Sequence, residues 1–181
     1  MNSIIQILVY FLISFFILFI SIDQLKKNFA DIPNKRSSHK IIKPKSGGFI
    51  FVLNSFLSFL KSFDILFLLS IPLSLVGLAD DKFNLPRKIR FFSQVFTIII
   101  ILIFSYNASF LSTEYKLILF PILLLLGTSI INFINFMDGI DGIVSGCFFI
   151  IFLAGTILIS KFYLPITISI FVFILFNWHP S

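Results

Sequence analysis

Residues 117–135 read LILFPILLLLGTSIINFIN, and residues 136–142 continue as FMDGIDG. The first stretch is almost wholly apolar and approaches the roughly 20 residues that a helix needs to cross a membrane. The second stretch places two carboxylates directly at the end of that helix. Because a carboxylate at the bilayer centre costs about 2.5–3.5 kcal/mol, acids are tolerated only at helix ends or in wet clefts. The two stretches together predict a membrane helix that ends in a polar site.

The composition extends this prediction to the whole chain. Of 181 residues, 58% are hydrophobic and only 12% are charged, and the mean hydropathy is +1.07, which excludes an ordinary soluble domain. We expect an all-α fold, a polytopic transmembrane helical bundle of about seven spans in a single domain over residues 1–181. The predicted spans are Ile4 to Ile22, Phe49 to Leu60, Ile65 to Ala79, Phe91 to Tyr106, Leu117 to Asn135, Ile143 to Ser160 and Leu164 to Phe176.

The basic residues predict an orientation. The first apolar stretch is too long for a signal peptide and has no basic residue before it, so we expect a retained helix with the N-terminus outside. Basic residues crowd the first and third connections, which the positive-inside rule places in the cytoplasm. Because they flank apolar spans, we assign the net charge of +6 to contact with the lipid bilayer and not with nucleic acid. Association into a homo-oligomer stays open.

A first acidic island, residues 77–81, ends the third predicted span. Its adjacent carboxylates, Asp80 and Asp81, repel each other, and a bound divalent cation would offset that repulsion. Mg²⁺ is the hard cation that carboxylate oxygens and a phosphate would favour. Arg90 follows in a cationic cluster and could clamp a phosphate through two parallel hydrogen bonds. The open alternative is a positive-inside loop in which acids balance bases.

The second acidic island forms a polar strip at the end of its span. Asn132, Asn135, Asp138 and Asp141 fall three residues apart. Because a buried amide without partners is costly, we expect the strip to line a polar cleft, and four such groups suit a nucleotide-sugar. The alternative is a loop whose Asn and Asp residues cap the following helix, which would leave Asn132 unexplained.

The first connection holds a third candidate. Residues 43–48 read KPKSGG and open directly into a predicted helix. Backbone amides at the glycine pair, with Lys45 beside them, could hold an anion at the helix N-terminus. Alternatively, the lysines only set the topology and His39 is a solvated loop residue.

These three motifs resemble, in the same order, those of the polyprenyl-phosphate N-acetylhexosamine-1-phosphate transferases. Residues 37–48 resemble the family's first cytoplasmic motif, residues 77–94 its Asp-Asp motif, and residues 132–146 its Asn-x-x-Asn-x-x-Asp-Gly-x-Asp-Gly motif. The family includes peptidoglycan enzymes, the phospho-N-acetylmuramoyl-pentapeptide transferases, and undecaprenyl-phosphate GlcNAc-1-phosphate transferases. The wording of the third motif is closer to the branch that initiates O-antigen and other surface glycans.

The resemblance implies a reaction and roles for residues. It implies transfer of an N-acetylhexosamine-1-phosphate from a UDP-sugar to polyprenyl phosphate, releasing UMP, with Mg²⁺ as cofactor, at the cytoplasmic side of a bacterial inner membrane. Asp80 and Asp81 would be catalytic and metal-binding, with Asp80 deprotonating the lipid phosphate. The implied substrate-binding residues are Asn132, Asn135, Asp138, Asp141, His39, Lys45 and Arg90. Lys45 stands where the family usually has arginine, which keeps the charge but loses the bidentate fork.

The resemblance covers only the first half to two-thirds of the family pattern. Residues 176–181, FNWHPS, resemble the approach to a later motif, Phe-Met-Gly-Asp, whose aspartate is a metal ligand in the family. We therefore expect a C-terminally shortened member. One open alternative is an inactive remnant or a non-catalytic membrane binding subunit. A weaker alternative is an ion or lipid transporter, since acidic residues at the membrane edge also mark transport paths. Against it, no acidic residue falls in the middle of a predicted span.

Overall fold

The computed structural model describes residues 3–31, 43–44, 47–69, 71–105, 113–137 and 142–177. Seven α-helices account for most of them: α1 (Ser3–Asn28), α2 (Phe49–Ser62), α3 (Ile71–Phe83), α4 (Arg87–Ser105), α5 (Thr113–Met137), α6 (Ile143–Leu158) and α7 (Leu164–Asn177). Two short 3₁₀ helices, η1 (Ile65–Phe67) and η2 (Lys161–Tyr163), precede α3 and α7. The predicted helical fold is confirmed over the described residues.

One predicted span differs in the structure. The stretch predicted as a single helix from Ile65 to Ala79 begins as η1 and resumes as α3 at Ile71. Asp64 caps η1, since its carboxylate accepts a hydrogen bond of 3.0 Å from the Leu66 N–H. Pro72 cannot donate a backbone hydrogen bond, so it is tolerated in the first turn of α3 but would interrupt a helix arriving from η1.

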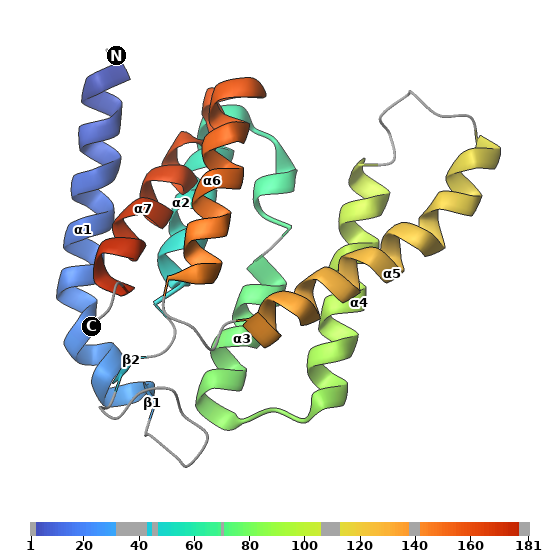
Figure 1. Ribbon diagram of the computed structural model, residues 1–181, viewed down its shortest axis with the longest axis horizontal. Coiled ribbons are helices and arrows are strands. Elements are labelled where there is room, and N and C mark those ends of the chain that lie inside the picture. Colours follow the sequence, from blue (N-terminus) through green and yellow to red (C-terminus); the bar gives the residue numbers. More distant parts are fainter. Residues whose placement is uncertain are drawn as a thin grey trace.

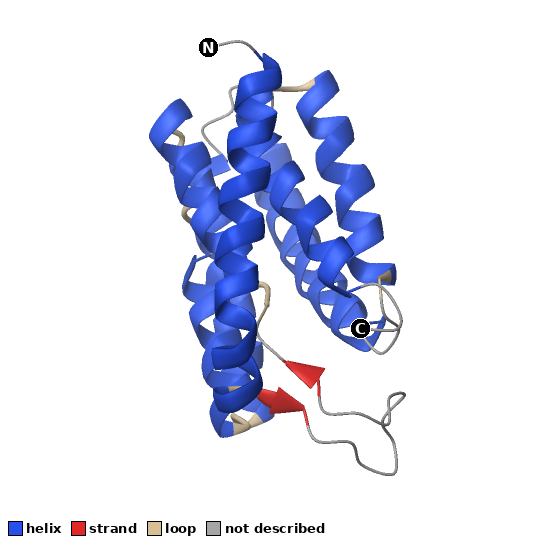
Figure 2. Ribbon diagram, turned by 90° about the vertical axis from the view of Figure 1, so that its left-hand side faces the viewer, coloured by secondary structure: helices blue, strands red, loops and turns tan. Residues whose placement is uncertain are grey.

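A second difference is a small sheet in the first connection. Strands β1 (Ala30–Asp31) and β2 (Lys43–Pro44) pair antiparallel, with Ala30 opposite Pro44. Figure 2 shows the pair toward the lower end of the molecule, beside the end of α1. Two-residue strands leave no periodic pattern in a sequence, so this pairing was not predicted.

Helix α7 lies among α1, α2 and α6 and contacts all three (Figure 1). Leu18 of α1, Ile50 of α2 and Val172 of α7 form the buried centre of this group. Phenylalanine rings extend it, with ring centroids 5.4 Å apart for Phe15 and Phe176. This group, the α7 group, is centred on apolar packing.

Helices α3, α4 and α5 form a second group, in which α4 contacts both of the others and α5 crosses it obliquely (Figure 1). Among the described residues of these three helices, Ile98 is the one buried apolar side chain. A Cβ added at Gly127 of α5 would lie 3.0 Å from Ile98 Cδ1, so α4 and α5 meet closely at that glycine. We call this set the α4 group.

The outer surface suits a hydrocarbon environment. Large apolar side chains are exposed on every α-helix of the described chain, as at Phe136 and Leu158. Hydroxyl groups bond to carbonyls within their own helices, for example Ser21 Oγ to the Ile17 oxygen at 2.6 Å. This local pairing satisfies polar groups where water is absent.

Two helical segments, Ile4–Asn28 and Ile118–Met137, are long and apolar enough to cross a membrane. Three further apolar helical segments are shorter: Phe49–Ser62, Ile143–Leu158 and Lys161–Asn177. At 1.5 Å per residue, a helix of 14 residues such as α2 is about 21 Å long, whereas the hydrocarbon is about 30 Å thick. The number of membrane crossings stays a prediction.

Candidate functional site

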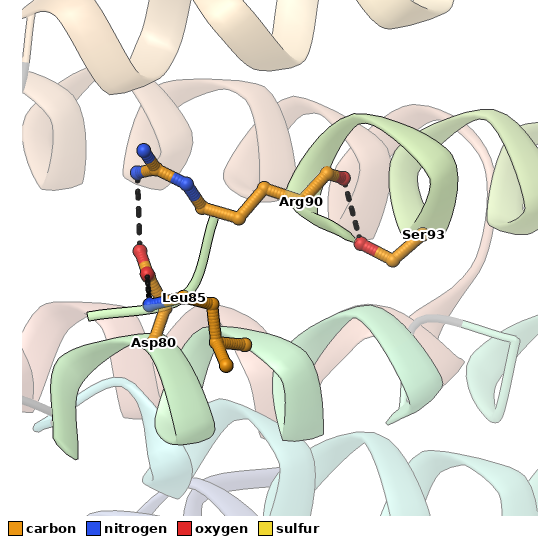
Figure 3. A network of polar contacts seen from close by, with 4 residues as sticks. All are labelled: Asp80, Leu85, Arg90 and Ser93. Carbon is orange, nitrogen blue, oxygen red and sulfur yellow. Dashed lines mark hydrogen bonds and ion pairs between the residues drawn. The ribbon is translucent and has the colours of Figure 1, made fainter. Parts of the chain in front are cut away.

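The predicted catalytic residue Asp80 organises the turn between α3 and α4. It lies in the last turn of α3, and its carbonyl accepts a hydrogen bond of 2.8 Å from the N–H of Asn84. Asn84 adopts the left-handed conformation (φ 49°) that asparagine tolerates, and the helix ends there. The Oδ1 atom of Asp80 accepts a second hydrogen bond, of 2.8 Å, from the Leu85 N–H (Figure 3). The carboxylate thus fixes the start of the connection to α4.

Arg90 contacts the other oxygen of the same carboxylate. Its Nη1 atom lies 3.1 Å from Asp80 Oδ2, within the first turns of α4 (Figure 3). The Asp80 side chain is 25% exposed and that of Arg90 is 43% exposed, so solvent screens this pair. The contact uses one terminal nitrogen of a guanidinium that has five N–H donors. The two oppositely charged residues that the sequence predicted to serve one site do lie together.

Asp81 follows in the same helical turn and is exposed. Among the described residues, no three His, Cys, Asp or Glu side chains gather as a closed metal cage would require. Mg²⁺ in phosphate-transfer sites is commonly bound by one or two carboxylates, with water and substrate phosphate completing the shell. Asp80 and Asp81 supply carboxylates, which are the type of ligand that Mg²⁺ prefers.

The polar strip of α5 meets α4 through Asn132. Its Nδ2 atom donates to Gln94 Oε1 at 3.1 Å and to the Thr128 carbonyl at 2.9 Å. Gln94 is 4% exposed and lies one helical turn beyond Arg90 on α4. Helix α4 therefore contacts both predicted motifs, Asp80 through Arg90 and Asn132 through Gln94.

The remaining candidates are placed as follows. Asn135 is exposed on α5, one turn closer to the end of that helix than Asn132. Asp138, Asp141, His39 and Lys45 lie outside the described residues. Gln94 was not predicted as a partner of Asn132. The sequence feature that could have predicted this contact is a single amide in a largely apolar stretch of α4, because a buried amide requires a hydrogen-bond partner.

The predicted anion-binding loop joins the α7 group at its last residues. Gly47 and Gly48 form the turn that precedes α2. A Cβ added at Gly47 would lie 2.8 Å from the Phe173 ring of α7, so the close approach of this turn requires glycine. In Figure 1 the strands, the α3–α4 connection and the C-terminal end of α5 all lie toward the lower end of the molecule. The parts of the three predicted motifs that the structure describes in these elements therefore lie toward one end of the bundle.

Comparison with known proteins identifies the family. The model of the family described as "Glycosyl transferase family 4" matches residues 63–181. The chain is 25% identical over 179 residues to a probable undecaprenyl-phosphate N-acetylglucosaminyl 1-phosphate transferase of Bacillus subtilis, covering 87% of this chain and 50% of the relative. It is 31% identical over 137 residues to the undecaprenyl-phosphate alpha-N-acetylglucosaminyl 1-phosphate transferase of Thermotoga maritima, covering 75% of this chain and 45% of the relative.

The chain thus spans about half the length of these curated relatives. No solved structure matches it at a significant level. The family comprises polytopic membrane proteins whose members are phospho-N-acetylhexosamine transferases. Because the family model matches more than half of the 181 residues, the chain belongs to glycosyl transferase family 4.

Proposed function

We propose that the chain transfers an N-acetylhexosamine-1-phosphate from a UDP-sugar to a polyprenyl phosphate and releases UMP. The observation that carries this proposal is the contact of Asp80 with Arg90 at the α3–α4 turn, beside the exposed Asp81. It joins carboxylates suited to Mg²⁺ with a guanidinium suited to phosphate. Two relatives named as undecaprenyl-phosphate N-acetylglucosaminyl 1-phosphate transferases make UDP-N-acetylglucosamine and undecaprenyl phosphate the first substrates to test.

In the proposed reaction, an oxygen of the lipid phosphate attacks the β-phosphorus of the UDP-sugar. The bond between that phosphorus and the bridging oxygen breaks, and UMP leaves with the bridging oxygen. Such a transfer needs in-line positioning and neutralisation of charge more than covalent help. A Mg²⁺ held by Asp80 and Asp81 would neutralise charge on the pyrophosphate.

The residues of the α3–α4 turn have separate parts in this proposal. Each carboxylate oxygen has two lone pairs, so the contacts with Leu85 and Arg90 orient Asp80 and leave further acceptor positions. Asp80 would accept the proton of the lipid phosphate. Arg90 would bind phosphate through the donors that it does not use on Asp80.

The other predicted residues complete the proposed substrate site. Asn135, Asp138 and Asp141 would hold the nucleotide-sugar, while Lys45 and His39 would lie near phosphate. The site would face the cytoplasm of a bacterium, because the basic connections favour that side. The product would be a lipid-linked sugar pyrophosphate that initiates a cell-envelope glycan.

The test is transfer of labelled sugar phosphate by the purified chain in lipid nanodiscs. We expect UMP and labelled lipid to form from UDP-N-acetylglucosamine, undecaprenyl phosphate and Mg²⁺, and we expect Asp80→Asn and Asp81→Asn each to abolish both products. Asp64→Asn is the matched control, because Asp64 is an exposed carboxylate that caps η1, a role asparagine also fills. Formation of UMP no faster than in the Asp80→Asn, Asp81→Asn double variant would instead indicate a non-catalytic membrane binding protein.

A further inference from the structure

The amide of Gln94 is buried in the α4 group but lies between the two acidic motifs. The residue is 4% exposed, and its Oε1 atom accepts a hydrogen bond of 3.1 Å from Nδ2 of Asn132. The same nitrogen of Asn132 donates a second hydrogen bond, of 2.9 Å, to the Thr128 carbonyl. Since an amide nitrogen has two N–H donors, both donors of Asn132 are used within the protein.

The packing around this contact sets its register. Gly127 of α5 lies against Ile98 of α4, where an added Cβ would be 3.0–3.1 Å from two atoms of the isoleucine side chain. Ile98 is one turn beyond Gln94, and Gly127 lies five residues before Asn132, as expected for antiparallel helices. The close approach at Gly127 therefore brings the two amides within hydrogen-bond reach.

Helix α4 thus has two successive polar contacts, each to a different motif. Arg90 binds Asp80 of α3 at 3.1 Å, and Gln94, one turn later, binds Asn132 of α5. A helix is stiff over one turn, so a change in either contact shifts one motif relative to the other. The hydrogen bond between Gln94 and Asn132 links helices that are otherwise joined by few buried side chains.

We propose that Gln94 is a positioning residue that acts through Asn132 and fixes the nucleotide-binding strip of α5 relative to Asp80 and Arg90. Asn132 then serves as the tie between helices and not as a donor to substrate, and Asn135 is the first residue of the strip that contacts the nucleotide-sugar. The functional half of this inference rests on the proposed function. The structural half, the placement of α5 against α3 and α4, does not.

The structural half is tested without substrate. Spin labels at the exposed positions Phe83 and Phe136, at the ends of α3 and α5, report the separation of the two motifs, once the exposed Cys147 has been replaced by alanine. We expect Gln94→Leu to broaden and lengthen the distance distribution. The exchange Gln94→Asn with Asn132→Gln keeps the total side-chain length and the donor–acceptor pair, so it should restore the distribution, whereas either single change should not.

Thr97→Val is the matched control on the same helix. The Thr97 hydroxyl is buried and has no hydrogen-bond partner, so its removal should leave the distribution unchanged. A Gln94→Leu distribution identical to that of the wild type would overturn the proposal. So would an exchange variant that folds but stays as broad as the single variants. If Gln94→Leu does not fold, Gln94→Asn and the exchange make the same comparison.

The functional half is tested by splitting the kinetic constants for UDP-N-acetylglucosamine. We expect Gln94→Leu to raise KM by about tenfold, because a change of that size corresponds to the loss of roughly one hydrogen-bonded contact. The exchange should restore KM to within about twofold of the wild-type value. A purely structural role would lower the active fraction, and so kcat, with KM unchanged, which would contradict positioning. If the wild type shows no transfer while the spin-label distances respond as expected, the proposed function fails and the placement of α5 by Gln94 stands.

Discussion

The α7 group and the α4 group are built from different contacts. In the first, Leu18, Ile50 and Val172 are buried together and rings such as Phe51 and Phe173 pack at 5.2 Å between centroids. In the second, Ile98 is the one buried apolar residue among the described residues of α3, α4 and α5, and polar contacts connect these three helices. The α7 group is a scaffold, whereas the α4 group is held in part by the Asp80–Arg90 pair, whose partly exposed charges a charged ligand can also bind.

One interhelical polar pair from each group shows a difference in burial. In the α7 group, Asn54 of α2 and Ser14 of α1 are fully buried. Asn54 Nδ2 donates a hydrogen bond of 3.3 Å to Ser14 Oγ. In the α4 group, Asp80 and Arg90 are partly exposed. Burial commits the first pair to structure, while exposure leaves the second pair accessible to phosphate and metal.

The largest effect should come from exchanging the ion pair as Asp80→Arg with Arg90→Asp. The exchanged charges can pair again, so we expect the melting temperature to recover toward the wild-type value from that of either single variant. Transfer activity should stay lower by about 10³-fold, because the carboxylate no longer lies beside Asp81. The measurements are thermal unfolding and the initial rate of UMP release. Recovery of the transfer rate together with stability would show that the pair is only structural.

In the α7 group, Ile50→Ala should lower stability and leave substrate binding unchanged, the reverse of the result expected for the exchanged ion pair. Removing this fully buried side chain should lower the free energy of unfolding by about 2–5 kcal/mol, as other large-to-small core changes do. Affinity for UDP-N-acetylglucosamine should be unchanged at temperatures where the variant is folded. Leu53→Ala, at an exposed position on the same helix, is the control and should change stability little in detergent. A variant that kept its stability but lost affinity would place the α7 group in the binding site.

A smaller effect is expected for Ser14→Ala. This change removes the 3.3 Å contact with Asn54, whose Nδ2 atom keeps its 3.0 Å hydrogen bond to the Ile50 carbonyl. Interhelical hydrogen bonds in membrane proteins average about 0.6 kcal/mol, so denaturant unfolding should show a loss of that order. Kinetic constants for the sugar nucleotide should be unaltered. A tenfold rise in KM would contradict the separation of the two groups.

The smallest net effect on stability should follow Gly127→Ala. The new methyl group would press on Ile98 at about 3.0 Å and push α4 from α5. The better helix propensity of alanine, worth up to about 1 kcal/mol, would offset most of this cost. Unfolding should therefore change little, while spin-label distances between α4 and α5 should lengthen. Adding Ile98→Val should reverse that shift; if it does not, the contact at Gly127 does not set the spacing.

Much of the fold follows from the apolar runs, since seven predicted spans correspond to seven helices of the described chain. The third was predicted to begin too early, because its hydropathy is continuous from Ile65 through Pro72, whereas the missing N–H of Pro72 favours a separate helix that begins at Ile71. The two-residue strands gave no signal. Whether each helix crosses a membrane depends on the bilayer, which hydropathy alone does not specify.

The site was less predictable where contacts are distant in sequence. Asp80 and Arg90 lie ten residues apart on either side of a turn, so their nearness follows from local sequence. Gln94 and Asn132 are 38 residues apart, and their contact depends on the register that Gly127 and Ile98 impose on two packed helices. The roles predicted for Asp138, Asp141, His39 and Lys45 stay predictions, because these residues lie outside the described chain.

The most direct measurement is calorimetric binding of UDP-N-acetylglucosamine to the purified chain, with Mg²⁺ and with chelator. If the α4 group is a Mg²⁺-dependent nucleotide-sugar site, binding will require Mg²⁺, will be lost in the Asp80→Asn, Asp81→Asn double variant and will persist in Asp64→Asn. Binding of equal strength in the double variant, or in chelator, would contradict the assignment of the site to these carboxylates.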